Sequence, residues 1–183
     1  MTVAALPASR ARLWAEFLAL FAGVPVLMAA TFGLYPLFPV IIGLAFVAAT
    51  LLQITPGWRW SMLWKGPVFG EWRVIAVYGA ATLATCLAVV FALVPGRFLE
   101  LPTYRPELWL MIMVLYPILS AFPQEVIYRS LFFERYGGLF PNDWTAIVAN
   151  GVAFGFGHLF FDSWVTIAMT GCGGAIMGWA YLR

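Results

Sequence analysis

The sequence has few charged residues, two cysteines and a single histidine. Of its 183 residues, ten are Lys or Arg and eight are Asp or Glu, which makes 10% charged. An ordinary soluble domain is about a quarter charged, so this composition excludes a soluble globular protein. Cys86 and Cys172 lie inside different apolar stretches, where they are expected to act as small packing residues. That placement argues against a disulfide or a cysteine metal site.

Long apolar stretches fill the space between the charges. Hydrophobic residues make up 63% of the chain, and uncharged stretches cover 17–58, 74–96, 108–124, 144–161 and 163–182. A helix needs about 20 apolar residues to cross a bilayer, and the first stretch is long enough for two such helices, divided at Pro36 and Pro39. We therefore predict an all-α, polytopic membrane bundle of six helices, near 13–34, 38–55, 73–94, 107–133, 144–160 and 163–182.

Cations gather on one side of these predicted spans. Cytoplasmic loops carry the excess of Lys and Arg, so the richer side is expected to be cytoplasmic. The opposite side has only Arg97 and Arg105, offset by Glu100 and Glu107. Both ends of the chain are therefore predicted to be cytoplasmic. The cations on that side are Arg10, Arg12, Arg59, Lys65, Arg73, Arg129, Arg135 and Arg183.

Tryptophans and cations alternate between the second and third predicted spans. The segment 57–65 and the pair Trp72 and Arg73 together hold four tryptophans and three cations. Indoles prefer the headgroup zone of a bilayer, so we expect an interfacial loop or short helix here. The bilayer is thus the expected partner, and a nucleic acid is not. We divide the chain into N-terminal helices with this loop, 1–106, and a motif-bearing part, 107–183.

Two ionisable residues interrupt the fourth predicted span. Glu125 and Arg129 lie between the apolar runs 108–122 and 131–133. Ionisable groups inside a membrane normally face protein or a water-filled cavity. Their four-residue spacing puts them on one helical face, within reach of an ion pair. On this feature alone, a structural pair and a functional pair fit equally well.

The fifth predicted span carries Asn150, Phe154 and His158 on one helical face, because each is four residues from the next. The turn before this span is placed at 137–142, with Asn142 or Asp143 as the N-cap. Counting from that turn at 1.5 Å per residue puts Glu125 about 16 Å and His158 about 24 Å deep. Helix tilt can absorb the difference, so both side chains are predicted to face one polar cavity. The glycines of the last two spans are expected to let the helices pack closely.

These residues resemble two motifs of a known family. The run Gln124-Glu125-Val-Ile-Tyr-Arg129, followed by Phe154-Gly-Phe-Gly-His158, is similar to the Glu-Glu-x-x-x-Arg and Phe-x-x-x-His motifs of the CPBP intramembrane proteases. This family contains the CAAX prenyl endopeptidases, the lysostaphin-resistance proteins and the Abi bacteriocin-immunity proteins. The resemblance covers about 107–183. It implies a helical membrane endopeptidase in which a glutamate activates water and a histidine assists, without a tightly bound metal, and it suggests the bacterial inner membrane.

The sequence departs from this pattern in two places. Gln124 stands where the first glutamate is expected, and an amide cannot act as a general base. A later histidine of the family is not present before Arg183, which suggests a longer natural chain. Either Glu125 serves as the base or the protein is impaired as a protease.

The leading hypothesis is hydrolysis of a peptide bond in a membrane-anchored or lipidated, CAAX-type protein. Glu125 and His158 would activate water, Arg129 would keep the glutamate ionised, and Gln124 or Asn150 would bind the oxyanion. Phe154 and Tyr128 are further candidates for substrate or oxyanion binding. Zinc is disfavoured, because one His and one Glu fall short of the usual three protein ligands. The alternatives are a non-catalytic immunity or binding protein with the same fold and, less favoured, a transporter fragment.

Overall fold

The computed structural model describes residues 9–64 and 71–183, and in these residues it contains helices and turns but no strand. Helical segments occur at all six predicted places, which confirms the all-α prediction. The first comprises α1 (Arg10–Leu18), a π-helical turn (Ala19–Gly23) and α2 (Val24–Ala30). It is followed by α3 (Leu37–Gln53) and α4 (Trp72–Leu93), and the chain ends with α10 (Trp164–Tyr181).

The two helical segments that carry the motifs are made of several pieces. Pro106–Leu139 is a continuous helical run that contains α6 (Pro106–Tyr116), α7 (Phe122–Glu125) and α8 (Phe132–Tyr136). Two π-helical turns, Pro117–Ala121 and Val126–Leu131, separate these pieces, and a 3-10 turn, Gly137–Leu139, ends the run. The second segment consists of α9 (Asp143–Phe156) and a short 3-10 turn, Leu159–Phe161. Asn142 caps α9 through a capping box with Thr145, so of the two predicted N-cap residues it is Asn142 that caps the helix.

Four of the helical segments are long and apolar enough to cross a membrane. They are Arg10–Ala30, Trp72–Leu93, Pro106–Leu139 and Asp143–Phe161, and α3 is a shorter apolar helix. The predicted number of six spans remains a prediction, because α3 and α10 do not reach the same length and hydropathy. The cytoplasmic location of the termini is likewise still a prediction.

The chain forms two compact units. One consists of the residues up to Arg59 together with Ile118–Arg183, and the other is Trp60–Pro117. The second unit holds the 3-10 turn Trp60–Trp64, α4, α5 (Glu100–Tyr104) and α6. None of the side chains of α4 is buried, although this helix is strongly apolar. In the predicted interfacial segment, Trp64 is 79% exposed, while Lys65 lies outside the described residues.

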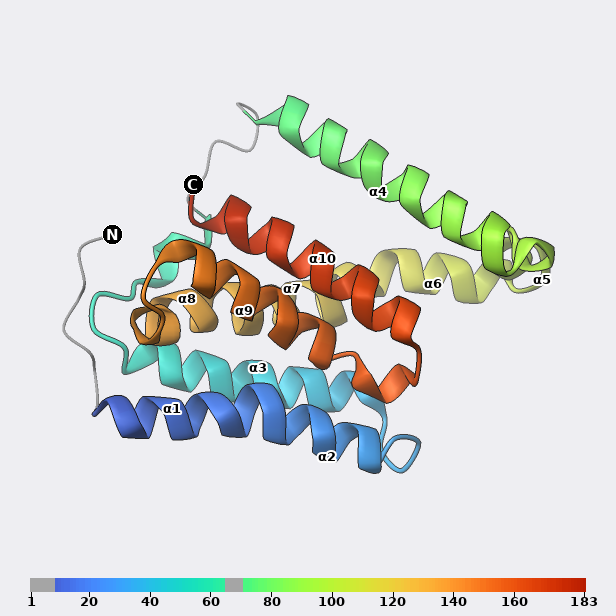
Figure 1. Ribbon diagram of the computed structural model, residues 1–183. Helices are drawn as coiled ribbons and strands as arrows, with labels where there is room; N and C mark the ends of the chain where they lie inside the picture. Colours follow the sequence, from blue (N-terminus) through green and yellow to red (C-terminus); the bar gives the residue numbers. More distant parts are fainter. Residues whose placement is uncertain (1–8, 65–70) are drawn as a thin grey trace. The chain divides into compact units, whose positions relative to one another are not determined.

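In the first unit, α9 and α10 lie side by side and pack through small residues (Figure 1). A Cβ added to Gly151 would come within 2.8 Å of the Gly171 carbonyl oxygen, and one added to Gly155 would meet the Ile167 carbonyl oxygen at 2.8 Å. Any side chain at these two positions would force the helices apart. The glycines therefore pack the last two helices, as the sequence predicts.

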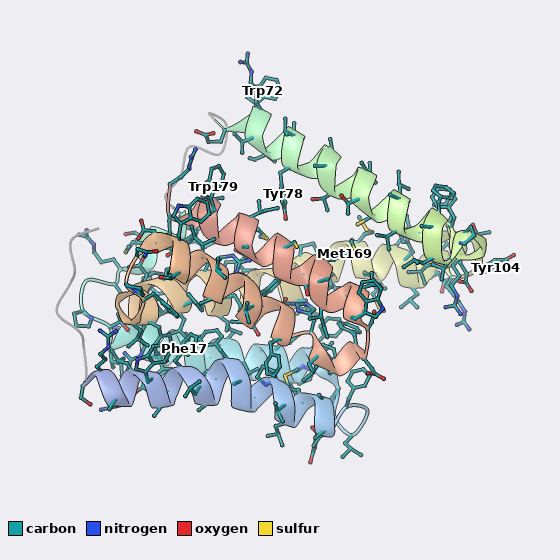
Figure 2. The ribbon with its side chains drawn as sticks, viewed as in Figure 1. Phe17, Trp72, Tyr78, Tyr104, Met169 and Trp179 are labelled. Atoms are coloured by element: carbon teal, nitrogen blue, oxygen red, sulfur yellow. The ribbon has the colours of Figure 1, made fainter. Side chains whose placement is uncertain are left out.

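Aromatic rings join α1 to α8 and the following turn. Phe17 lies on the inner side of α1 (Figure 2), and its ring centroid is 5.6 Å from Phe132, 5.8 Å from Tyr136 and 5.7 Å from Phe140. Edge-to-face rings at such distances add stability beyond the area that they bury. The N-terminal helix is thus packed directly against the motif-bearing segment.

A buried ion pair fixes the same helices. The Arg135 side chain is 1% exposed, and its Nη2 and Nε donate to Glu16 Oε2 at 2.7 and 2.9 Å. Arg135 Nη1 donates to Thr55 Oγ1 at 3.1 Å, just beyond the end of α3. Arg12 Nε donates to the other oxygen of Glu16 at 2.9 Å. Arg135 therefore ties α1, α3 and α8 together, although its place in the sequence suggested a cation in a cytoplasmic loop.

Candidate functional site

Glu125 and Arg129 stand where the helix changes its hydrogen-bond pattern. Glu125 ends α7, and Arg129 lies in the π-helical turn Val126–Leu131. Such turns within α-helices are frequent at functional sites, because the extra residue re-aims the side chains around it. Arg129 Nε lies 3.5 Å from Glu125 Oε2, so the structure contains the pair that the four-residue spacing predicts. The Arg129 side chain is 2% exposed, whereas that of Glu125 is 39% exposed.

Arg129 has further partners on α9. Its Nη1 donates to Asn150 Oδ1 at 2.9 Å, and its guanidinium carbon lies 5.0 Å from the centroid of the Phe154 ring. Asn150 is fully buried, and its Nδ2 donates to the backbone carbonyl of Tyr128. The Asn150 amide thus links α9 to the π-helical turn through both of its polar atoms. Asn150 therefore holds the Arg129 side chain against α9.

His158 follows the C-terminal end of α9 and is held by that end. Its Nδ1 lies 2.7 Å from the Phe154 carbonyl oxygen, and its ring centroid is 4.8 Å from that of Phe154. A carbonyl oxygen can only accept a hydrogen bond, so Nδ1 carries the hydrogen. In the neutral ring, Nε2 then has the lone pair and can accept a proton or hydrogen bond. The turn of the chain therefore fixes both the orientation and the tautomer of His158.

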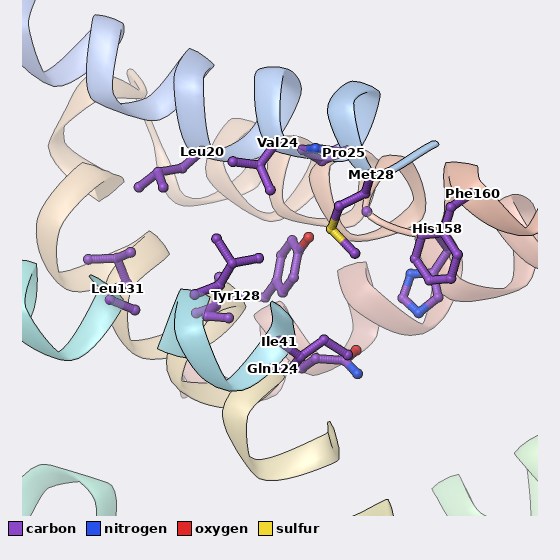
Figure 3. Close-up of a pocket in the computed structure, with 14 residues that line it drawn as sticks. Leu20, Val24, Pro25, Met28, Ile41, Gln124, Tyr128, Leu131, His158 and Phe160 are labelled. Atoms are coloured by element: carbon purple, nitrogen blue, oxygen red, sulfur yellow. The ribbon is translucent and has the colours of Figure 1, made fainter. Parts of the chain in front are cut away.

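Three of the predicted residues line one small cavity. Gln124, Tyr128 and His158 are its polar residues (Figure 3). The rest of its wall comes from apolar residues between 20 and 48 and from Ile127, Leu131, Gly157 and Phe160. The cavity has a volume of about 50 Å³. A water needs roughly 10–15 Å³ of such space, so the cavity has room for about three to five waters. Gln124 Nε2 donates to Ser120 Oγ at 2.7 Å, which holds the amide at the cavity wall.

The other predicted residues form a second cluster beside this cavity. Glu125, Arg129 and Asn150 are not among the residues that line it. Gln124 and Glu125 are neighbours in one helix, and neighbouring side chains point in different directions. The Phe154 ring joins the two clusters, because it also packs edge-on against Tyr128 with centroids 4.9 Å apart. The structure therefore places Gln124 in the same cavity as His158, whereas the residue count from the turn predicted Glu125 there.

Two features of the site had little or no sequence signal. The first is the cavity wall formed by α2 and α3, whose residues are uniformly apolar. The second is Gly157, where an added Cβ would collide with the Tyr128 hydroxyl oxygen. The absence of a side chain at 157 is what allows the Tyr128 hydroxyl to reach the cavity beside His158. A glycine next to a candidate catalytic histidine is the signal that could have indicated this contact.

A metal ion does not fit this donor set. The cavity offers one imidazole, one amide and one phenol, and catalytic zinc takes three protein ligands of the His, Asp, Glu or Cys type. Within 9–64 and 71–183, no group of three such residues could hold a metal. The expectation of a metal-independent site remains a prediction.

Comparison with known proteins bears on the same segment. Residues 106–183 match the family described as Rce1-like, type II CAAX prenyl endopeptidase. This part of the chain is similar to the Rce1-like family. That similarity and the apolar helices together support an integral membrane protein that resembles the CAAX-type intramembrane proteases in residues 106–183. Neither a curated protein nor a solved structure matches the chain significantly.

Proposed function

We propose that this chain is an intramembrane endopeptidase that cleaves a membrane-anchored or lipidated protein substrate. The observation that carries the proposal is the cavity of Gln124, Tyr128 and His158, which has room for water and contains an imidazole with a fixed tautomer. A water-filled cavity with a proton acceptor is the minimum that hydrolysis requires. The Rce1-like relationship of residues 106–183 supports the same reaction class.

In the proposed reaction, a cavity water attacks the carbonyl carbon of the scissile peptide bond. His158 Nε2 accepts the proton of this water and later returns it to the leaving amine, so that acid and amine products are formed. The Tyr128 hydroxyl and the Gln124 amide are the donors beside His158 that can stabilise the oxyanion. Asn150 acts as a positioning residue, since its amide already binds Arg129 and the Tyr128 carbonyl.

Glu125 is the candidate second base. Its contact with Arg129, 3.5 Å, is longer than the 2.7–2.9 Å typical of a charge-assisted hydrogen bond. The carboxylate is therefore loosely held and can turn toward the neighbouring cavity at small cost. The Arg129 guanidinium places a positive charge beside this carboxylate.

A non-catalytic membrane immunity or binding protein is the second candidate. It is favoured by one observation, namely that an amide, Gln124, and not a carboxylate, lines the cavity next to His158. In this alternative, Glu125 and Arg129 form a structural pair, and the cavity binds a peptide segment without cleaving it.

The deciding experiment measures cleavage of lipidated, membrane-anchored peptides by the full-length protein in proteoliposomes. The peptides end in CAAX-type sequences. Proteolysis predicts that His158→Ala and Glu125→Gln each lower kcat/KM about 10²–10⁴-fold. Gln124→Glu exchanges an oxyanion donor for a second base beside His158, so a rise in kcat/KM would show that the cavity lacks a base, and a fall that the Gln124 amide binds the oxyanion. Glu134→Gln is the matched control, because Glu134 lies on the same helical run but binds Tyr181 at 3.0 Å, outside the cavity. If neither His158→Ala nor Glu125→Gln changes the cleavage rate, the catalytic assignment is refuted. Peptide binding without cleavage in every variant would support the non-catalytic candidate.

A further inference from the structure

The cavity beside His158 is closed on one side by the short helix α2 (Val24–Ala30). Its volume of about 50 Å³ is enough for a few waters but not for a peptide with its side chains. A large substrate side chain can therefore fit beside His158 only when a side chain of the cavity wall moves away. The residue that moves decides how large a group is admitted.

The polar wall of the cavity is held in place. Gln124 is hydrogen-bonded to Ser120, and His158 is hydrogen-bonded to the Phe154 carbonyl. The Tyr128 ring packs edge-on against the Phe154 ring. Moving any of these groups breaks a hydrogen bond or a ring contact inside a closely packed interior. The opening must therefore come from the apolar wall.

Met28 has the most flexible side chain of that wall. It is partly exposed, and Figure 3 shows its side chain between the Tyr128 ring and the His158 imidazole. Methionine is unbranched and has three rotatable bonds, whereas neighbouring Val24 is stiff and Pro25 is fixed in its ring. A rotation of the Met28 side chain alone would enlarge the space next to His158.

The backbone that carries Met28 is also weakly tied to the rest of its helix. The π-helical turn Ala19–Gly23 comes directly before α2, and Val24 N–H bonds to the Ala19 carbonyl, five residues back. Pro25 has no N–H to continue the ladder. Helices bend at such combinations of π-turn and proline. Both the Met28 side chain and the α2 backbone that carries it can therefore move when a larger group enters the cavity.

We propose that Met28 is the specificity-determining residue of this cavity. With Met28 in place, the cavity accepts a small side chain, such as that of Gly, Ala or Ser, beside His158. Shortening Met28 admits a larger one. The consequence for cleavage rests on the proposed endopeptidase function, whereas the control of access to His158 does not.

The single histidine of the chain provides a direct test of access. Diethyl pyrocarbonate is a small reagent for neutral imidazole, and 4-bromophenacyl bromide is a larger one. The rate at which each modifies His158 is measured by peptide mass spectrometry on protein purified without a polyhistidine tag. The variants are Met28→Ala, Met28→Phe and, as a folded reference of similar volume, Met28→Leu. The matched control is Leu27→Ala, since Leu27 is 62% exposed and does not line the cavity.

We expect Met28→Ala to raise the rate with the larger reagent about tenfold relative to the smaller one, in the range by which pockets discriminate small size differences. Met28→Phe should lower both rates, and Leu27→Ala should change neither. Equal rates in wild type and Met28→Ala, with the larger reagent, would overturn the proposal.

The second arm compares cleavage of two membrane-anchored peptides that carry Ala or Phe next to the scissile bond. Met28→Ala should raise kcat/KM for the Phe peptide about tenfold relative to the Ala peptide. An unchanged ratio would overturn the role in specificity. If no variant cleaves either peptide, the proposed endopeptidase function fails, and the modification rates of His158 still decide whether Met28 controls access.

Discussion

Arg129 and Arg135 lie on one helical run, six positions apart, and both are almost completely buried, yet their carboxylate partners are held very differently. Glu16 accepts hydrogen bonds from Arg135 at 2.7 and 2.9 Å and from Arg12 at 2.9 Å. Glu125 is 3.5 Å from Arg129 and 39% exposed at its side chain. A carboxylate with several short hydrogen bonds stabilises the fold, whereas a loosely held one next to a cavity is suited to accept a proton.

The comparison also shows why the Arg129 guanidinium does not depend on Glu125 alone. The side-chain amide of Asn150 and the ring of Phe154 contact the same guanidinium. Removing Glu125 therefore leaves Arg129 with partners, and removing Glu16 takes the only carboxylate contact of the described residues from Arg135. The two sites should respond to mutation in opposite ways, one through stability and one through activity.

The largest effect on stability is expected for Glu16→Ala. The substitution leaves the Arg135 cation buried without a carboxylate, which typically costs about 3–5 kcal/mol. The free energy of unfolding in mixed detergent micelles measures this loss. Arg12→Ala removes only the exposed partner of Glu16 and should cost less than about 1 kcal/mol. Equal losses in the two variants would contradict the structural role of the inner pair.

Gly178→Ala should have the next largest effect and should act mainly on the Arg129 site, although its Cβ would also come within 3.1 Å of the Phe133 ring. An added Cβ would come within 2.9 Å of Asn150 Oδ1, the atom that accepts the hydrogen bond from Arg129. Overpacking of this kind costs about 1–3 kcal/mol. Gly137→Ala is the control, since its Cβ would meet nothing within 4 Å. Equal stability of Gly178→Ala and Gly137→Ala would contradict the close packing of α10 against Asn150 of α9.

Thr55→Val tests the hydroxyl partner of Arg135. It replaces the hydroxyl that accepts a hydrogen bond from Arg135 Nη1 at 3.1 Å with a methyl group of similar size. A hydrogen bond to a buried charged group contributes about 1.5 kcal/mol, and the loss is measured by the same unfolding experiment. The exposed Thr50→Val, whose hydroxyl binds only the Phe46 carbonyl of its own helix, should be nearly neutral. A neutral result at Thr55 would show that its hydroxyl does not stabilise Arg135 and would leave the Leu51 carbonyl, 3.4 Å from Arg135 Nη1, as the contact with α3.

The smallest effect on stability is expected for Glu125→Gln. The pair with Arg129 is long and the carboxylate is partly exposed, so the loss should stay near or below about 1 kcal/mol. The same variant is expected to lose most of its proteolytic activity. A stability loss as large as that of Glu16→Ala would show that Glu125 is structural and would favour the non-catalytic alternative.

Much of the fold was predictable because charges are rare in this sequence. Uncharged stretches located the helices, and the four-residue spacing of Glu125 and Arg129 predicted their ion pair. Counting residues from the turn at 137–142 predicted that Glu125 faces the cavity with His158. Such a count gives only the distance along the helix axis and does not give the direction in which a side chain points around it. The structure orients Gln124 to the cavity and Glu125 to Arg129.

The partners of Arg135 and the apolar wall of the cavity could not be derived from the sequence. Glu16 and Arg135 are 119 positions apart, and no local spacing relates them. Met28 is one apolar residue in a long apolar stretch, so nothing in its type or position distinguishes it from residues that face lipid. Both features arise only when distant helices pack together.

The ion pair of Glu16 and Arg135 has a consequence for the order in which the protein assembles. Glu16 is synthesised with the first helix, and the whole of Trp60–Pro117 follows before Arg135. During that interval, Arg12 on the same helix is the cation within reach of Glu16. The first unit is complete only after the last third of the chain has been synthesised. The N-terminal helix therefore forms before Arg135, the buried partner of Glu16, is available.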